Sequence, residues 1–182
     1  VMPRFLILYA TREGQTAKVA ARIADHLRQA GAEATLIDAA NALVTESLDP
    51  GDFDRLVFGA SMHAGGLEKE LVQFVNTHAE AIRGRPHFLF VVLLSAAATD
   101  PAVREEWLGD AGRKIRDQLQ VSFDDTEMIA GALSYSKYSF PVKWLMRRLA
   151  RKAGAETRTD RDYEYTDWEQ VRRYAEHLLE AG

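Results

Sequence analysis

The sequence predicts an α/β protein built on a doubly wound, five-stranded parallel sheet. Strand-length apolar runs alternate along the whole chain with segments whose apolar residues recur at helical spacing. The apolar runs are nearly continuous, which is typical of parallel strands buried on both faces. No segment repeats another, and 182 residues suit one sizeable core. We therefore expect a single domain over residues 1–182.

Three strands and two helices are expected in the first half of the chain. Segments 5–10, 34–38 and 55–59 are mainly apolar, so each of them predicts a strand. Helical spacing links Val19, Ile23 and Leu27 within 15–30, and Gly31 ends that helix. The second helix is expected to carry Leu67, Leu71, Phe74, Val75 and Ile82.

The second half adds two strands and two helices, with a basic segment between them. Residues 88–94 are apolar throughout and predict a central strand, and a fifth strand is expected near 128–130. Asp100-Pro101 is a typical helix start, and we expect that helix to run to about residue 120. Thr166 and Glu169 have the spacing of a capping box that opens the last helix, which ends near residue 179.

Five strands without an internal repeat fit the order 2-1-3-4-5. In such sheets the ligand lies outside the carboxyl ends of the strands, at the switch point between strands one and three. Three loops should therefore meet there: 11–16, 61–66 and 95–100. The second loop and the strand end before it, 59–66, are rich in small residues, so the backbone can approach a flat ligand closely.

The first of these loops is the most informative segment of the chain. Thr11, Gly14 and Thr16 stand between the first strand and the first helix, where free backbone N–H groups and the helix dipole favour a phosphate. A P-loop would need a Lys, and a dinucleotide fingerprint would need three spaced glycines. A phosphate seat beside flexible small-residue loops suggests FMN. An ordinary strand-to-helix turn is the alternative interpretation.

Composition narrows the class of protein further. The chain has no Cys, which excludes disulfides, thiolate catalysis and Cys-ligated metals, and its histidines show no metal-ligand spacing. No apolar run is long enough to span a membrane, and no signal peptide is evident, so we expect a cytoplasmic protein. The net charge is −4, but residues 134–153 alone carry +6. This asymmetry indicates one negatively charged partner and argues against general nucleic-acid affinity.

The basic segment predicts a helix that begins at Phe140-Pro141. One face would be apolar, and the remainder would carry the residues expected to contact a substrate or a membrane. These are Lys143, Trp144, Arg147, Arg148, Arg151 and Lys152. A Trp among cations suits an anionic membrane surface, which would make the protein peripheral on the cytoplasmic face, and equally suits carboxylates of a ligand. A third interpretation is that the apolar stripe packs on the protein and the charges are solvated.

Several motifs together resemble a known family. They are Thr-Arg-x-Gly-Gln-Thr at 11–16, Gly-Ala-Ser at 59–61, Ile-Ala-Gly-Ala-Leu-x-Tyr-x-x-Tyr at 129–138, Gly-x-Glu-Thr-x-Thr-x-Arg at 154–161 and Tyr-Thr-Asp-Trp-Glu-Gln-Val at 165–171. The chain resembles the bacterial flavodoxin-like, menaquinone-dependent protoporphyrinogen IX dehydrogenases over nearly its whole length. The resemblance implies FMN, oxidation of protoporphyrinogen IX to protoporphyrin IX in heme biosynthesis, and electron transfer to a membrane quinone. It also implies an insert, here at about 134–160.

The resemblance implies roles for three sets of residues. The FMN phosphate would be held by Thr11, Arg12, Glu13, Gly14, Gln15 and Thr16. The isoalloxazine would be flanked by Ser61, Met62, His63, Ala64 and Gly65 on one side and by Ser95, Ala96, Ala97, Ala98 and Thr99 on the other. This chain lacks the aromatic residues that sandwich the ring in many flavodoxins. His63 is the one side chain of the second loop suited to relay a proton near neutral pH, and a surface-loop histidine is the alternative.

Other functions stay open at this point. The chain could be a flavodoxin-like electron carrier, a quinone-linked flavin oxidoreductase with another substrate, or a flavin-free interaction module. The basic insert could meet lipid, porphyrin or a second subunit, which leaves a homo-oligomer open. Four tyrosines flank the insert and are expected to pack it onto the core, namely Tyr135, Tyr138, Tyr163 and Tyr165. We interpret Trp107 and Trp168, which lie on helix patterns, as core residues.

Overall fold

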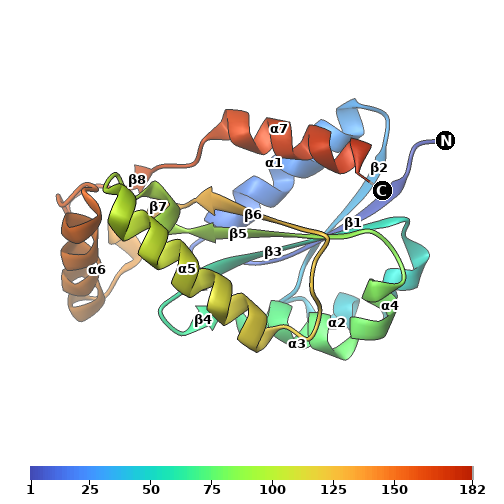
Figure 1. Cartoon of the computed structure of the whole chain (residues 1–182), viewed down its shortest axis with the longest axis horizontal. Helices are drawn as coiled ribbons and strands as arrows, with labels where there is room; N and C mark the ends of the chain where they lie inside the picture. Colours follow the sequence, from blue (N-terminus) through green and yellow to red (C-terminus); the bar gives the residue numbers. More distant parts are fainter. Residues whose placement is uncertain (182) are drawn as a thin grey trace.

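Five parallel strands form the centre of the molecule, with helices on both faces (Figure 1). The computed structural model describes residues 1–181. The strands are β1 (Arg4–Ala10), β2 (Glu33–Asp38), β3 (Arg55–His63), β5 (His87–Leu93) and β6 (Asp125–Ala130). They lie in the order β2-β1-β3-β5-β6, and every neighbouring pair is parallel. The predicted doubly wound sheet and its strand order are confirmed.

The helices cover the two faces unequally. In Figure 1, α1 (Gln15–Gln29) and α7 (Trp168–Glu180) lie above the sheet. Below it lie α3 (Lys69–Thr77), α4 (Ala79–Arg83) and α5 (Pro101–Gln118). Short connecting turns complete this part of the chain: α2 (Ala42–Thr45), η1 (Pro50–Asp52) and η2 (Leu94–Ala97). Within residues 1–181, no helix is both long and apolar enough to cross a membrane.

Two hydrophobic clusters fill the spaces between the sheet and its helices. Alternate strand residues face opposite sides, so Leu6 and Leu8 pack toward α3 and α5, whereas Phe5 and Ile7 pack toward α1 and α7. Gly59, inside β3, faces the ring of Phe90 on β5, and a Cβ at this position would overlap that ring. The absence of a side chain at Gly59 therefore serves core packing.

The second predicted helix is wrong in detail. Strand β3 continues to His63 and turns back into β4 (Gly66–Leu67), so Met62 pairs antiparallel with Leu67. The helical segment begins only at Lys69, and it breaks at His78, whose ψ of 20° leaves the helical range and separates α3 from α4. The second loop is therefore the tip of a β-hairpin. The sequence did not reveal this strand pairing, because Leu67 also fits the helical spacing of the apolar residues that follow it.

The predicted capping box is also wrong, although the last helix is present. Asp167 is the N-cap of α7, because its side chain accepts hydrogen bonds from the N–H groups of Glu169 and Gln170. Thr166 instead donates to the carbonyl of Ala130 at 2.7 Å and is buried. At the start of α5 the predicted cap is confirmed, since Asp100 accepts from Ala102 N–H at 2.9 Å.

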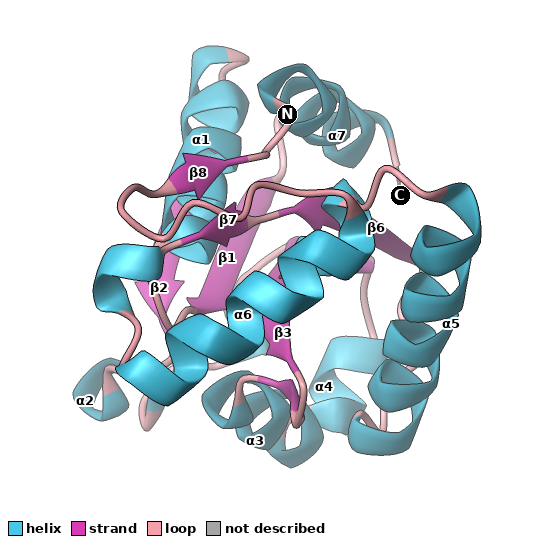
Figure 2. Cartoon of the chain, turned by 90° about the vertical axis from the view of Figure 1, so that its left-hand side faces the viewer, coloured by secondary structure: helices cyan, strands magenta, loops and turns pink. Residues whose placement is uncertain are grey.

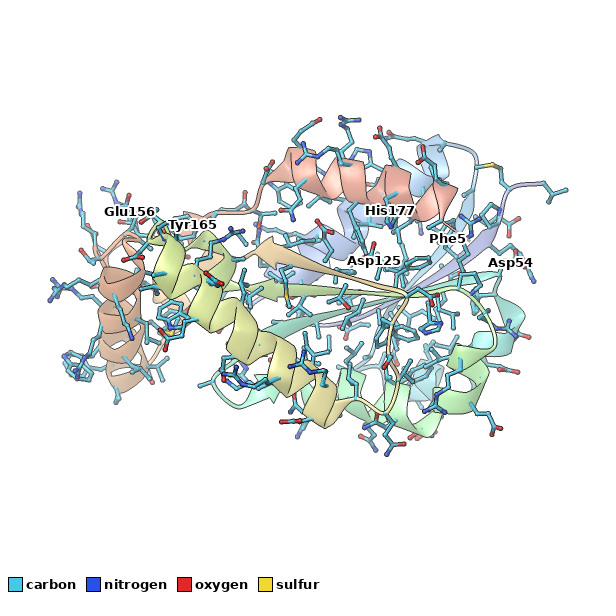
Figure 3. All side chains as sticks on the ribbon, in the orientation of Figure 1. Phe5, Asp54, Asp125, Glu156, Tyr165 and His177 are labelled. Carbon is cyan, nitrogen blue, oxygen red and sulfur yellow. The ribbon has the colours of Figure 1, made fainter. Side chains whose placement is uncertain are left out.

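The basic insert lies across the carboxyl ends of the strands (Figure 2). The predicted insert, about 134–160, contains η3 (Tyr135–Lys137) and α6 (Phe140–Ala153), and it is flanked by β7 (Ala132–Leu133) and β8 (Tyr163–Glu164), which pair antiparallel. The four tyrosines pack around Leu133 and Ala150, as predicted. Figure 3 shows Tyr165 and Glu156 at this end of the molecule, where the Tyr165 hydroxyl accepts from the Glu156 N–H at 3.0 Å. The insert is thus fixed to the sheet by its own small core.

Candidate functional site

The first loop places free hydrogen-bond donors at the start of α1, which makes it a candidate anion seat. Gly14 is the N-cap with a φ of 102°, and the Thr11 hydroxyl accepts its N–H at 3.0 Å. No side chain caps the helix, and its first turn holds no acidic residue, so the positive end of the dipole faces the loop uncompensated. Thr16 is 1% exposed, and its hydroxyl has no hydrogen-bond partner. A buried hydroxyl without a partner is costly, and a bound anion would satisfy it.

Two side chains fix this loop to the insert. The Gln15 amide donates to Glu164 and to Thr166, both at 2.9 Å, which joins α1 to the segment before α7. Lys137, from η3, donates to the carbonyl of Glu13. Its ammonium group also lies 3.8 Å from where a Cβ on Gly14 would stand. Lys137 therefore places a cation beside the first loop, which its position 124 residues from Glu13 in the sequence did not reveal.

The β3–β4 hairpin forms the second side of the site. Ser61 is 8% exposed, and its hydroxyl also lacks a partner. Ala64 and Gly65 form the hairpin turn. The side chain of Gln118, at the end of α5, holds the hairpin by accepting the Leu67 N–H at 2.9 Å. Gly66 has a φ of 109°, and a Cβ there would overlap the Gln118 amide, so this clamp requires glycine.

Four charged or titratable groups meet at the base of the hairpin. Glu68 is close to Arg12 Nε at 3.2 Å and to His63 Nε2 at 3.4 Å, and His63 is 3.9 Å from Glu13. Burial and then the Arg12 charge lower the pKa of His63 to about 4, so its imidazole is neutral at neutral pH. Burial also raises the pKa of Glu13 above its usual value. His63 is three-quarters buried in this cluster, which excludes the surface-loop interpretation.

The third loop contributes less than the resemblance implied. Ser95 lines the cavity at the site, but Ala96, Ala97, Ala98 and Thr99 do not. Ala96 packs on the core and Ala98 is buried. Thr99 donates from its backbone N–H to the carbonyl of Ala153 at 2.9 Å, which joins this loop to the end of α6. The third loop therefore supports the insert as much as it borders the site.

A cavity of about 470 Å³ joins these loops beneath the insert. Of the predicted flavin residues, the lining includes Thr11, Arg12, Glu13, Gln15, Thr16, Ser61, Met62, His63, Ala64, Gly65 and Ser95, and omits Gly14. Its roof is the apolar stripe of α6, formed by Val142, Leu145, Met146 and Leu149. Its side wall is one face of α5, formed by Trp107, Asp110, Ala111 and Lys114. Trp107 is thus a half-buried cavity residue and not the core residue that its helical position suggested, whereas Trp168 packs on the core.

None of the basic residues predicted to contact substrate or membrane lines the cavity. Arg147, Arg148, Arg151 and Lys152 are exposed on α6, and Arg148 lies 5.7 Å from the ring of Trp144. Trp144 is 58% exposed and Phe140 84% exposed. The outer surface of α6 thus combines cations with large apolar side chains. Within residues 1–181, no group of three or more His, Asp or Glu could hold a metal ion.

The donors at the site fit a flavin phosphate. Thr16, the N-terminus of α1 and Lys137 converge at the anion seat, and the Ser61 hydroxyl is free on the cavity wall. The apolar roof and hairpin tip leave room for a flat ring. This arrangement, at the carboxyl ends of β1, β3 and β5, is the one expected of a flavodoxin-type protein.

Comparisons with known proteins agree with the fold. The flavodoxin domain model matches residues 6–160. Protoporphyrinogen IX dehydrogenase (quinone) of Escherichia coli strain K12 is 33% identical over 173 residues, which are 95% of this chain and 93% of that protein. The protein of the same name from Leishmania major is 29% identical over 175 residues, covering 95% of this chain and 73% of that one.

Solved structures show the same architecture. Oxidised flavodoxin 1 from Bacillus cereus superposes with a TM-score of 0.55 at 14% identity, over 98% of this chain and 99% of that one. Flavodoxin 2 from the same organism gives 0.54 at 16% identity, again over 98% and 99%. The fold and site thus define a flavodoxin-like protein. More particularly, the chain belongs to the family of the protoporphyrinogen IX dehydrogenases (quinone), which are oxidoreductases.

Proposed function

We propose that this protein binds FMN, oxidises protoporphyrinogen IX to protoporphyrin IX and passes the electrons to a quinone. The observation that carries the proposal is a cavity with two buried, unpartnered hydroxyls, those of Thr16 and Ser61, at the switch point of the sheet and beneath an apolar roof. The relatives that are named for this reaction match along 95% of the chain, which includes the insert that forms the roof.

The first loop would hold the FMN phosphate. The Thr16 hydroxyl and the free N–H groups at the start of α1 can donate to phosphate oxygens, and Lys137 adds a positive charge. Arg12 is less suited to this role, because its guanidinium is directed to Glu68. When bound, FMN supplies the electron sink that removes hydride equivalents from the substrate.

The hairpin and the insert would set the environment of the reacting groups. The pKa of His63, lowered to about 4, keeps its imidazole neutral and only weakly basic at neutral pH, so His63 would act as a neutral polar group beside the ring, with Glu68 at 3.4 Å, more than as a proton relay. The α6 stripe of Val142, Leu145, Met146 and Leu149 would cover the macrocycle and keep water from the cavity. These roles rest on the positions of the side chains around the cavity.

The outer surface of α6 would contact an anionic membrane surface. Phe140 and Trp144 can enter the headgroup region while the flanking Arg and Lys side chains meet lipid phosphates. Their absence from the cavity lining favours lipid over the substrate as the partner of these cations. Contact at α6 would also place the cavity roof beside the membrane, where a quinone is dissolved.

An anaerobic titration tests the proposed reaction. Protein loaded with FMN is mixed with protoporphyrinogen IX, and the flavin absorption band is followed. We expect the band to bleach and to return when a menaquinone analogue is added. Bound FMN that stays oxidised would contradict the proposal and favour an electron carrier or a different substrate. Failure to bind FMN in stoichiometric amount would favour a flavin-free interaction module.

The electron-carrier alternative predicts a different surface around the cofactor. A flavodoxin-type carrier would be expected to present an acidic docking face around the flavin. Here the insert that covers the cavity carries exposed cations. It also lies between another protein and the loops beneath it. These features support a small substrate inside the cavity over a protein partner outside it.

A further inference from the structure

One face of α5 lines the cavity, and it carries polar and charged side chains as well as apolar ones. Trp107, Asp110, Ala111 and Lys114 have the i, i+3, i+4, i+7 spacing of a single helix stripe, and all four line the cavity. Figure 2 shows α5 standing beside α6, which crosses in front of the strands. The stripe therefore faces the same space that the α6 roof covers, and it brings an indole and an ammonium group into it.

The cations at the cavity wall differ in how their charge is compensated. Within residues 1–181, the Lys and Arg side chains that line the cavity are Arg12 and Lys114. Arg12 lies 3.2 Å from Glu68, whose side chain is only 11% exposed, so a buried carboxylate already takes up its charge. Lys114 is 2.9 Å from Asp110, one turn earlier, but the Asp110 side chain is 47% exposed. A solvated ion pair of this kind is weak, and Lys114 can exchange or share it with a ligand carboxylate.

We infer that Lys114 binds a carboxylate side chain of the substrate, with Trp107 as the surface against which the macrocycle rests. This assignment depends on the proposed function. A tetrapyrrole with two carboxylates requires a cationic partner, and Lys114 would be that partner. Trp107 and Lys114 are seven residues apart, about 10 Å along the helix. Lys114 is one-third exposed, so it stands at the edge of the cavity, where propionate groups reach water while the ring system stays inside.

The geometry also explains what Asp110 and Lys152 do. Asp110 holds the Lys114 side chain along α5, and the nearby ammonium lowers the pKa of Asp110 so that it stays ionised. From α6, Lys152 Nζ lies 5.8 Å from the centre of the Trp107 ring but does not line the cavity. Trp107 is therefore fixed between α5 and α6, and Lys114 is the cation left for a ligand within this wall.

The test compares Lys114→Gln with wild type toward a free dicarboxylate and its uncharged counterpart. Arg116→Gln is the matched control, because Arg116 is an exposed cation on the same helix, outside the cavity lining. The first readout is an equilibrium titration of the FMN-loaded proteins with protoporphyrin IX and with its dimethyl ester. The second readout is the KM and kcat of flavin reduction by protoporphyrinogen IX. Affinity for FMN is measured in every variant.

We expect Lys114→Gln to weaken protoporphyrin IX binding and to raise KM about tenfold, as for loss of a partly solvated charge-assisted hydrogen bond. Affinity for the dimethyl ester and for FMN should be unchanged, kcat should change little, and Lys114→Arg should restore most of the dicarboxylate binding. Arg116→Gln should behave as wild type. Equal dicarboxylate binding in wild type and Lys114→Gln, or equal losses with acid and ester, would overturn the assignment.

Failure of the underlying reaction is distinguishable from failure of this assignment. If wild-type protein reduces its flavin with protoporphyrinogen IX but Lys114→Gln has the same KM, the proposed function stands and the role of Lys114 falls. If wild-type flavin is not reduced at all and protoporphyrin IX does not bind, the proposed function and this assignment fall together.

Discussion

Replacing Thr16 with valine should move two measured quantities in opposite directions. In the protein without ligand, the Thr16 hydroxyl is buried and has no hydrogen-bond partner. Valine has nearly the same shape and removes that unsatisfied group, so the free energy of unfolding of the apoprotein should rise. If the hydroxyl donates to the FMN phosphate, the same substitution should weaken cofactor binding. A purely structural threonine would not produce this pair of effects.

The sizes of both effects follow from the surroundings of the side chain. An unsatisfied buried hydroxyl costs about 1–3 kcal/mol, so valine should stabilise the apoprotein by roughly 1 kcal/mol. For a domain of this length that corresponds to about 2–4 °C in Tm. Helix propensity contributes almost nothing, because Thr and Val are nearly equal on that scale. Loss of a hydrogen bond to a charged phosphate costs about 1.5–3 kcal/mol, which is roughly a 10- to 100-fold increase in the Kd for FMN.

Two assays measure these quantities on the same preparations. Urea unfolding of the apoproteins gives the stability change, and quenching of flavin fluorescence gives the Kd for FMN. Thr126→Val is the matched control, because Thr126 is exposed on the edge strand β6, outside the cavity lining. It should leave FMN affinity unchanged. An unchanged Kd for Thr16→Val would refute the phosphate role, and a less stable apoprotein would refute the account of the buried hydroxyl.

Three further predictions concern the hairpin, the histidine and the insert. Gly66→Ala should destabilise the protein by about 1–2 kcal/mol in urea unfolding, because its φ of 109° disfavours a side chain, whereas Gly65→Ala, with nothing near its Cβ, should not. The pKa of His63, lowered to about 4, means that the unfolded chain binds more protons between pH 6.5 and 4. Stability should therefore fall by roughly 3 kcal/mol on acidification through that range, and His63→Gln should lack this part of the fall. Replacing Arg147, Arg148 and Arg151 together with Gln should weaken binding to phosphatidylserine vesicles by about 3 kcal/mol. Binding in the wild type should decrease steeply with salt, and equal binding to zwitterionic phosphatidylcholine vesicles would contradict the lipid proposal.

Much of the architecture was predictable because it follows from local patterns. Buried parallel strands must be apolar on both faces, so each strand can be recognised from its own apolar run, such as 88–94, and the alternation with helices follows. The alternation then leaves few ways to connect the strands, since crossovers are right-handed and short. The hairpin at Met62 and Leu67 was missed because a two-residue strand carries no period of its own. Its pairing depends on Gln118, fifty-one residues away.

Part of the candidate site was likewise predictable from local sequence, and part was not. The anion seat could be predicted from the first loop, because its glycine, hydroxyls and following helix are adjacent in the chain. Lys137, Trp107 and Lys114 could not be assigned to the site, since Lys137 comes from η3 and the other two from α5, both far from the first loop in the chain. The position of the third loop could not be predicted either, because it depends on the hydrogen bond from Thr99 N–H to the carbonyl of Ala153 at the end of α6.

The sequence by itself determined the class of fold, the order of the strands, the place of the loop proposed to hold a phosphate and the presence of an amphipathic basic helix. These properties are local, or they follow from the period of apolar residues. Only the tertiary structure decided which side of that helix meets the cavity. The period shows that α6 has an apolar and a basic face, but both a core and a ligand cavity accept an apolar stripe. Packing of Ala150 against the tyrosine cluster fixes the rotation of α6, so Leu145 and Leu149 border the cavity and the arginines are exposed outside it.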